Sequence, residues 1–325
     1  MAVLSQQFKD ALATLEPAAD ATHAATAHDE VRDRLDQDTQ LINWGLHTLL
    51  IGSYAREVSI RRVKDVDVFC KLPDLPRSYD PQDLLQKFSD VLHDTYGDRV
   101  AKNDRSVKVE FPAFDMHVDV VPARPLGEVW QIPDRQGGWE RTHPLRFGEL
   151  TTQRNKDHDG HYVPTVKLLR QTRRALLADA KPGGLFVEVA AYHAFAGIPT
   201  GTDAPRSTAG YYTKALETMA PILQAHADGT THLLNPAVPG QELHVRATDQ
   251  ELKDIADAWA KAAADAREAL DSLDPVAAGS IFAGLLGTTS DGADVFTPPT
   301  NTHAAAATAT PGHRTLPSGQ SPTFG

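Results

Sequence analysis

The sequence lacks the features of several common protein classes. Among 325 residues Cys70 is the only cysteine, which excludes an internal disulfide framework and a multi-cysteine zinc site. No apolar run approaches the roughly 18 residues that a membrane-spanning helix needs. The first 20 residues carry four charged side chains and have no apolar core of a secretory signal. We therefore expect a cytoplasmic protein that has no membrane partner.

Positive charge is also scarce in the chain as a whole. It contains 32 Lys and Arg against 43 Asp and Glu, a formal net charge of −11. Because coating DNA requires clustered cations, we expect no dedicated DNA binding. The sequence contains no P-loop, dinucleotide-binding fingerprint, zinc-protease helix or nucleophile elbow, so kinase, dehydrogenase and hydrolase functions lose their usual support.

The hydrophobic pattern changes along the chain. A loose helical period over residues 4–42, interrupted at Pro17, precedes apolar alternation that predicts strands at 49–51, 63–72, 100–111 and 116–121. An amphipathic helix is expected at 81–96, and Pro122, Pro125 and Pro133 are expected to break up the chain after the last strand. From Pro164 onward the spacing predicts helices at about 166–177, 185–195, 211–223 and 252–273.

These patterns predict three parts. The first, residues 1–160, holds an N-terminal helix and a core of mixed strands and helices, and residues 161–295 form a helical lobe. Residues 296–325 contain five prolines and one charged residue, Arg314. Since such a segment buries little apolar surface, we expect a disordered tail there.

Three aspartates carry the chemistry that the sequence indicates. Asp65 and Asp67 lie two residues apart in a valine-rich strand and so point to one face, while Val66 and Val68 point to the other. Asp119 has the same alternation in a later strand. Three converging carboxylates repel one another unless a cation intervenes. Oxygen-only ligands favour Mg²⁺ or Mn²⁺, and two such ions could activate an attacking hydroxyl and stabilise a leaving pyrophosphate.

A phosphate site is expected beside the aspartates. Gly52 and Ser53 follow an apolar strand, where a glycine lets backbone N–H groups and the serine hydroxyl approach phosphate oxygens. Residues 141–175 hold eight Lys or Arg and only three acids, a local reversal of the chain's charge. We expect a triphosphate there, with Lys167 as the best candidate for a phosphate contact.

The motif Gly52-Ser53-Tyr54-Ala55-Arg56, followed by Lys64-Asp65-Val66-Asp67-Val68, resembles the polymerase β-like nucleotidyltransferases. More narrowly, the chain is similar to the bacterial cGAS/DncV-like enzymes, relatives of oligoadenylate synthetase. The strand Val118 to Ala123 resembles the one that carries the family's third acid. The stretch Val163 to Leu169 resembles the start of its helical lobe, where a lysine, here Lys167, reaches the donor triphosphate. Gly184 stands where many relatives have serine.

The resemblance implies an α+β fold, a polymerase β-like core of mixed sheet and flanking helices with a C-terminal helical lobe. It implies a metal-dependent enzyme that makes a cyclic di- or trinucleotide from nucleoside triphosphates, ATP among them, and releases pyrophosphate. Such enzymes serve CBASS anti-phage defence, where the product activates a downstream effector. Base preference, linkage and ring size stay open.

Two other functions remain open at this point. The chain could be a terminal nucleotidyltransferase acting on RNA, protein or a small molecule. It could also be a non-catalytic module that senses nucleotide or RNA, although three intact acids argue against that. The final residue, Gly325, suggests one more partner, because an E1/E2-like ligase joins the C-terminal residue of some CBASS enzymes to a target.

Overall fold

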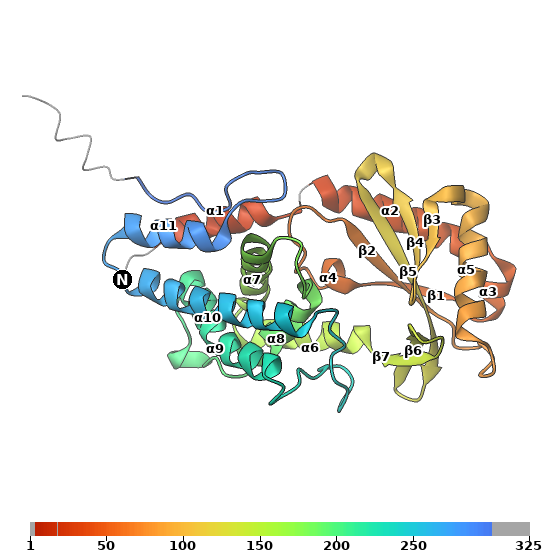
Figure 1. Ribbon diagram of the computed structural model, residues 1–325. Helices are drawn as coiled ribbons and strands as arrows, with labels where there is room; N and C mark the ends of the chain where they lie inside the picture. Colours follow the sequence, from red (N-terminus) through yellow and green to blue (C-terminus); the bar gives the residue numbers. More distant parts are fainter. Residues whose placement is uncertain (1–3, 18, 301–325) are drawn as a thin grey trace, which may run out of the picture.

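A mixed β-sheet organises the first half of the chain in the computed structural model, which describes residues 4–17 and 19–300 (Figure 1). Its strand order is β1-β2-β5-β4-β3. Only β2 and β5 pair in parallel, and the other pairs are antiparallel. The bounds are β1 (His47–Ile51), β2 (Asp65–Lys71), β3 (Val100–Lys102), β4 (Val107–Phe111) and β5 (Met116–Leu126).

Two of the strand predictions need correction. The single strand expected over 100–111 is a hairpin of β3 and β4. Of the prolines expected to break up the chain, Pro122 and Pro125 lie inside β5, which continues to Leu126 and pairs with β6 (Val129–Pro133). Pro133 is the last residue of β6, which pairs in turn with β7 (Trp139–Thr142). Pairing with β4 ends at Val120, so Pro122 stands where β5 has passed its neighbour, a position that tolerates a missing N–H.

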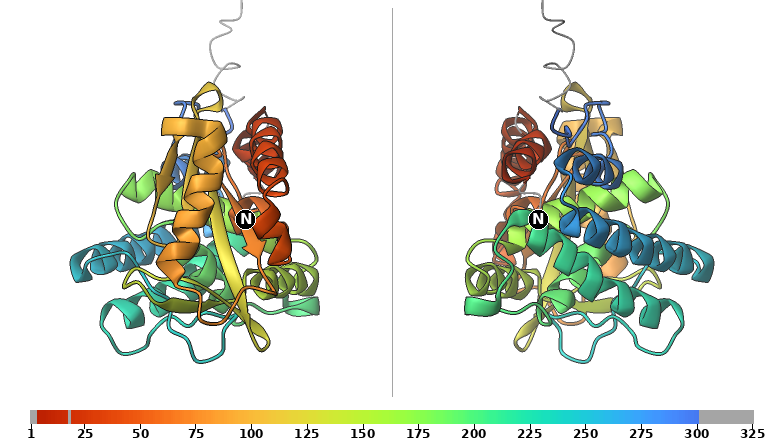
Figure 2. Two further views of the ribbon diagram at one scale, coloured as in Figure 1. Left: turned by 90° about the vertical axis from the view of Figure 1, so that its right-hand side faces the viewer. Right: turned by 90° about the vertical axis from the view of Figure 1, so that its left-hand side faces the viewer.

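Two helices cover one face of the sheet. Figure 2 shows α5 (Pro81–Tyr96, orange) beside α2 (Ala19–Leu35, red). Val66, Val68, Val118 and Val120 turn toward these helices and are fully buried. The helix α5 begins where predicted because the Asp80 carboxylate accepts hydrogen bonds from the backbone N–H groups of Gln82 and Asp83. The opposite face of β2 carries the acids.

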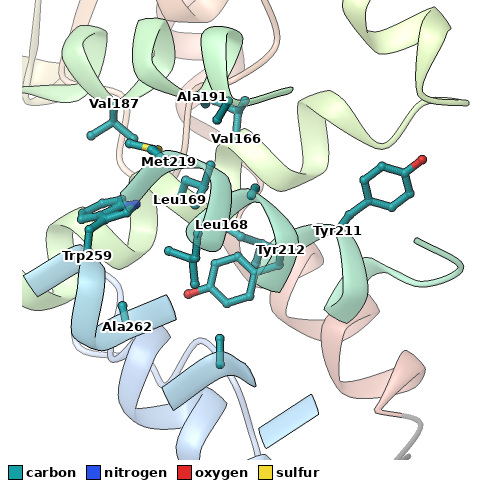
Figure 3. Packing of buried hydrophobic residues seen from close by; sticks show 14 of the residues in the cluster. Val166, Leu168, Leu169, Val187, Ala191, Tyr211, Tyr212, Met219, Trp259 and Ala262 are labelled. Carbon is teal, nitrogen blue, oxygen red and sulfur yellow. The ribbon is translucent and has the colours of Figure 1, made fainter. Parts of the chain in front are cut away.

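The second half of the chain is helical, as predicted, and packs around α7 (Tyr162–Leu177). The predicted helices correspond to α7, α8 (Gly184–Phe195), α9 (Thr208–Ala227) and α10 (Asp249–Asp271). Figure 3 shows their buried side chains meeting, with Leu169, Val187, Met219 and Trp259 contributed by four different helices.

Two helices of this region were not predicted. The helix α6 (Pro144–Asp157) buries only Phe147 and Thr151, so its apolar pattern is weak. The helix α11 (Pro275–Leu286) is apolar nearly throughout and lacks a periodic pattern. The segment between β5 and α7, where prolines were expected to break up the chain, contains the hairpin of β6 and β7 and the helix α6.

The first helix belongs with the helical region rather than with the sheet. Pro17 does interrupt the N-terminal helix, and α1 (Ser5–Leu15) packs on α7 and α9. The ring of Phe8 lies 4.9 Å from that of Phe282 and 5.1 Å from that of Phe296, measured between centroids. Phe296 is 2% exposed, which differs from the expected start of a disordered tail at residue 296. Residues 301–325 lie outside the described residues.

Further elements complete the description of the chain. They are α3 (Thr39–Asn43) before β1 and α4 (Gly52–Ala55) after it. No helix in the described ranges is both long and apolar enough to span a membrane. The α+β architecture with a C-terminal helical region is confirmed.

Candidate active site

A cavity of about 480 Å³ lies where the open face of β2 meets the helical region. Its wall combines the start of α4, the acids of β2, the start of α6, α7, the start of α8 and the segment 235–243. The lining residues that carry polar chemistry are Gly52, Ser53, Arg56, Asp65, Asp67, His143, Arg170, Glu188 and Asn235. Four of the positions selected from the sequence thus face one space.

The parallel pairing of β2 with β5 brings the third acid beside the first two. The register pairs Asp67 with Asp119 and Asp65 with His117. Burial, together with the negative charges of Asp65 and Asp119, raises the pKa of Asp67 to about 7. The predicted face of β2 is therefore confirmed, and the three carboxylates lie close enough to repel one another.

Gly52 is required at its position by the nearest aspartate. Its φ of +77° lies in the left-handed region, and a Cβ built there would stand 1.9 Å from Oδ2 of Asp67. Ser53 follows in the first turn of α4, and its hydroxyl lies 3.0 Å from the hydroxyl of Ser59. Because position 52 is glycine, the turn that carries Ser53 can pack directly against the carboxylate of Asp67.

Asp119 is held by contacts with its neighbours. The hydroxyl of Ser106 donates to Oδ1 at 2.9 Å, and Nε2 of His117 lies 3.4 Å from Oδ2. Burial opposes ionisation here, but these contacts outweigh it, and the pKa of Asp119 lies below its ordinary value. In the described part of the chain, no three His, Cys, Asp or Glu side chains form a group that could hold a metal as they stand.

The donor set nevertheless fits a hard divalent cation. All three side chains offer carboxylate oxygens, which is the chemistry that Mg²⁺ and Mn²⁺ prefer. Burial and the repulsion by Asp65 and Asp119 raise the pKa of Asp67, and a bound cation would remove that repulsion. Ser106 donates to only one oxygen of Asp119, Oδ1, so the carboxylate keeps a second oxygen, Oδ2, that a cation could use.

Two arginines and one glutamate form the floor of the cavity. Arg56 binds Glu188 through two hydrogen bonds of 2.5 and 2.9 Å, and Glu188 is fully buried. Burial opposes the charge on Arg56, but Glu188 outweighs it, so the pKa of Arg56 is raised. This ion pair joins the end of α4 to α8 and so connects the sheet region with the helical region.

Lys167 does not line the cavity. Its Nζ lies 2.6 Å from Oε1 of Glu16, at the end of α1, and the residue is 8% exposed. Arg170, one turn later in α7, lines the cavity instead. Gly325 lies outside the described residues.

The sequence reasoning missed Glu188, and it included Arg56 and Arg170 only among the basic residues near the expected triphosphate, without singling them out. Glu188 did leave a signal, because it is a lone acid in the apolar stretch Leu185 to Tyr192, and a buried acid requires a cationic partner. Asp65 and Asp67 of β2 face the cavity beside the Gly-Ser turn and two buried arginines, while Asp119 lies beside Asp67 on β5 but does not line the cavity. This arrangement is the one expected of a nucleotidyltransferase of the polymerase β-like class.

Comparisons with known proteins identify the family. A model of the Second Messenger Oligonucleotide or Dinucleotide Synthetase domain matches residues 1–155. A relative from Acinetobacter sp. (strain ATCC 27244 / 9458), called cyclic AMP-AMP-AMP synthase, is 30% identical over 305 residues, covering 87% of this chain and 84% of the relative. The chain belongs to the cGAS/DncV-like nucleotidyltransferases, the second-messenger oligonucleotide synthases.

Solved structures confirm the fold. The CdnC structure from E. coli MS115-1 with ATP has a TM-score of 0.70 at 16% identity, over 91% of this chain and 100% of that one. The CdnG structure from Bradyrhizobium diazoefficiens in complex with GTP has a TM-score of 0.66 at 15% identity, over 88% and 95%.

The expected activity is confirmed by this membership. The protein is a nucleotidyltransferase of the CBASS type that makes a cyclic oligonucleotide second messenger from nucleoside triphosphates. Enzymes of this family generally use divalent metal ions. The terminal transferase and the non-catalytic sensing module, which the sequence left open, are not supported.

Proposed function

We propose that this enzyme joins three molecules of ATP into cyclic tri-adenylate. The support is the 30% identical relative named for that product, whose similarity spans both the sheet region and the helical region. In each of three steps, a ribose hydroxyl oxygen of one nucleotide attacks the α-phosphorus of another. A new P–O bond forms, the bond to pyrophosphate breaks and the hydroxyl proton is released. Three ATP thus give one ring and three pyrophosphates.

We assign the residues of the cavity to this reaction as follows. Asp65, Asp67 and Asp119 hold two Mg²⁺ or Mn²⁺ ions, which lower the pKa of the attacking hydroxyl and neutralise the leaving group when bound. Gly52 admits the β- and γ-phosphates close to the backbone, and Ser53 donates its hydroxyl to them. The observation that carries this assignment is the contact of Asp67 with Gly52 on one side and its register with Asp119 on the other.

Product analysis tests the proposal directly. The purified protein is incubated with Mg²⁺ and ATP alone, and then with all four nucleoside triphosphates, and the products are identified by mass spectrometry. We expect cyclic tri-adenylate from ATP alone. A cyclic dinucleotide or a product containing another base would overturn the product assignment, and nucleotide binding without pyrophosphate release would overturn the catalytic one.

The aspartates are tested by removal. Asp65→Ala combined with Asp67→Ala is expected to abolish pyrophosphate release while the protein remains folded, because two repelling carboxylates are lost. Asp98→Asn, on the exposed turn after α5, is the matched control and is expected to retain activity. Activity at the wild-type level in the double variant contradicts the assignment.

A conjugation site at Gly325 is a separate part of the proposal. An E1/E2-like ligase would join the terminal carboxyl of Gly325 to an amine or thiol of its target. Mass spectrometry of the full chain co-expressed with its cognate ligase is expected to show an adduct through Gly325. Unmodified protein under those conditions, with an active ligase, contradicts it.

A further inference from the structure

The turn between β3 and β4 directs two polar side chains at one oxygen of Asp119. The hydroxyl of Ser106 donates to Oδ1 at 2.9 Å, and the side-chain amide of Asn103 adds a longer contact of 3.4 Å to the same oxygen. Ser106 is 9% exposed, so its hydrogen bond is largely shielded from water. Both contacts end on Oδ1, and neither uses Oδ2, the second oxygen of the carboxylate. Asp119 is therefore oriented through one oxygen only.

The turn, residues 103–106, is itself held in place. It closes through the backbone N–H of Asn103, which donates to the carbonyl of Ser106 at 2.8 Å, where the pairing of β3 with β4 ends. Nη2 of Arg105 lies 2.6 Å from Oε2 of Glu140 on β7, and these two side chains are 32% and 15% exposed. This ion pair ties the turn to a further strand, so the position of Ser106 does not depend on the hairpin of β3 and β4 alone.

The other groups around Asp119 leave its second oxygen without a strong donor. Lys108 is its partner in the register with β4, but the ammonium of Lys108 binds Glu110 at 2.5 Å. Nε2 of His117 lies 3.4 Å from Oδ2, which is longer than an ordinary N–H···O hydrogen bond. Asp67, its partner in the register with β2, carries a carboxylate that repels it. Oδ2 thus stands beside a second carboxylate, as a ligand of a shared cation does.

We propose that Ser106 is a positioning residue for the divalent ions, because its hydrogen bond to Oδ1 leaves Oδ2 of Asp119 for an ion shared with Asp67. The carboxylates that bind metals are themselves held by hydrogen bonds, and loss of such a partner typically costs about 10- to 100-fold in metal affinity or activity. Asp65 and Asp67 line the cavity and Asp119 does not, so Ser106 acts on the ion that Asp119 shares. This inference rests on the proposed function, since it takes two divalent ions to bind these acids.

Binding of Mn²⁺ to the full chain tests the inference without turnover. Electron paramagnetic resonance counts the bound ions during a titration at a saturating concentration of the non-reactive analogue adenosine 5′-(α,β-methylene)triphosphate. We expect two ions in the wild-type protein, and Asp119→Asn identifies the one that Asp119 holds. Ser106→Ala is expected to weaken that same ion about 10- to 100-fold and to leave the other within about twofold.

Further variants separate orientation of the carboxylate from folding. Ser106→Ala combined with Asp119→Asn should lose no more affinity than Asp119→Asn alone, because Ser106 acts only through that carboxylate. Asn103→Ala, which removes the longer contact, should weaken the same ion less than Ser106→Ala does. Ser280→Ala is the matched control, since its hydroxyl lies exposed on α11 and donates to the backbone carbonyl of Val276, and Mn²⁺ binding should be unchanged. Melting curves establish that each variant is folded.

The outcomes are distinct. Unchanged Mn²⁺ binding in Ser106→Ala, an equal loss of both ions, or a combined variant that binds more weakly than Asp119→Asn would each overturn the inference and leave the proposed function intact. A larger loss of the same ion in His117→Ala would also overturn it, because the orienting contact would then be the one at Oδ2. Failure of the wild-type protein to bind Mn²⁺ in the presence of the analogue would overturn both.

Discussion

Replacing Asp67 by asparagine should stabilise the metal-free protein, and the gain should grow with pH. The pKa of this carboxyl is raised from 3.8 in an unfolded chain to about 7 in the folded protein. The folded state therefore binds more protons than the unfolded state between these values, and stability falls as pH rises through that window. Above about pH 7 the loss is complete and constant. Asparagine cannot ionise, so it removes this loss.

The size of the effect follows from the same two values. At about 1.4 kcal/mol per pH unit, ionisation of Asp67 destabilises the folded state by about 2 kcal/mol at pH 5 and about 4 kcal/mol at pH 8. If the amide packs as the protonated acid does, Asp67→Asn gains those amounts. The difference between the two pH values, about 2 to 3 kcal/mol, does not depend on how well the amide packs.

Urea unfolding in EDTA at pH 5 and pH 8 measures this difference. Asp98→Asn is a suitable control, because Asp98 lies exposed in the turn after α5, and its replacement should change stability by less than about 0.5 kcal/mol at either pH. A gain in Asp67→Asn that is equal at both pH values, or a loss at pH 8, would show that burial and the charges of Asp65 and Asp119 do not raise the pKa of Asp67.

Three other predictions concern the same site. Gly52→Ala should abolish activity because its Cβ would lie 1.9 Å from Asp67, whereas Gly97→Ala, with φ of +56° and open space around it, should keep activity in the same assay. Glu188→Ala leaves Arg56 buried without its partner and should lower unfolding stability by about 3 to 5 kcal/mol, measured by urea titration; a loss under about 1 kcal/mol contradicts this. Added Mg²⁺ should raise the melting temperature of wild type by several degrees and that of Asp67→Asn much less, and equal shifts would argue against a metal at this carboxylate.

The part of the site that depends on local spacing could be predicted from the sequence. Alternation in β2 placed Asp65 and Asp67 on one face and the valines on the other, and both the strand and that face are confirmed. The need for glycine at position 52 was also visible, although its actual cause, contact with Asp67, was not. That contact depends on the register of β1 with β2, which pairs Ile51 with Asp67.

The parts that depend on distant contacts could not be predicted. Lys167, which the sequence pattern favoured, pairs with Glu16, 151 residues away, and does not line the cavity. Likewise, the pairing of Asp119 with Ser106 depends on the hairpin of β3 and β4, a turn that the sequence pattern had merged into one strand. The spacing of residues in the sequence predicts which side chains share a face of a strand or helix. Which of them is free to face the cavity depends on partners that are distant in the sequence.

The placement of α1 has a practical consequence for dissecting the molecule. Although α1 comes first in the chain, its Phe8 packs in the core of the helical region. The next helix, α2, packs on the sheet. A fragment that starts near residue 161 would lack Phe8 and so expose the aromatic side chains around Phe282. A fragment that stops there would contain α1 with its hydrophobic face exposed. To express the two halves separately, the first 16 residues should be moved from the sheet fragment to the helical fragment, for instance through a linker to the end of α11.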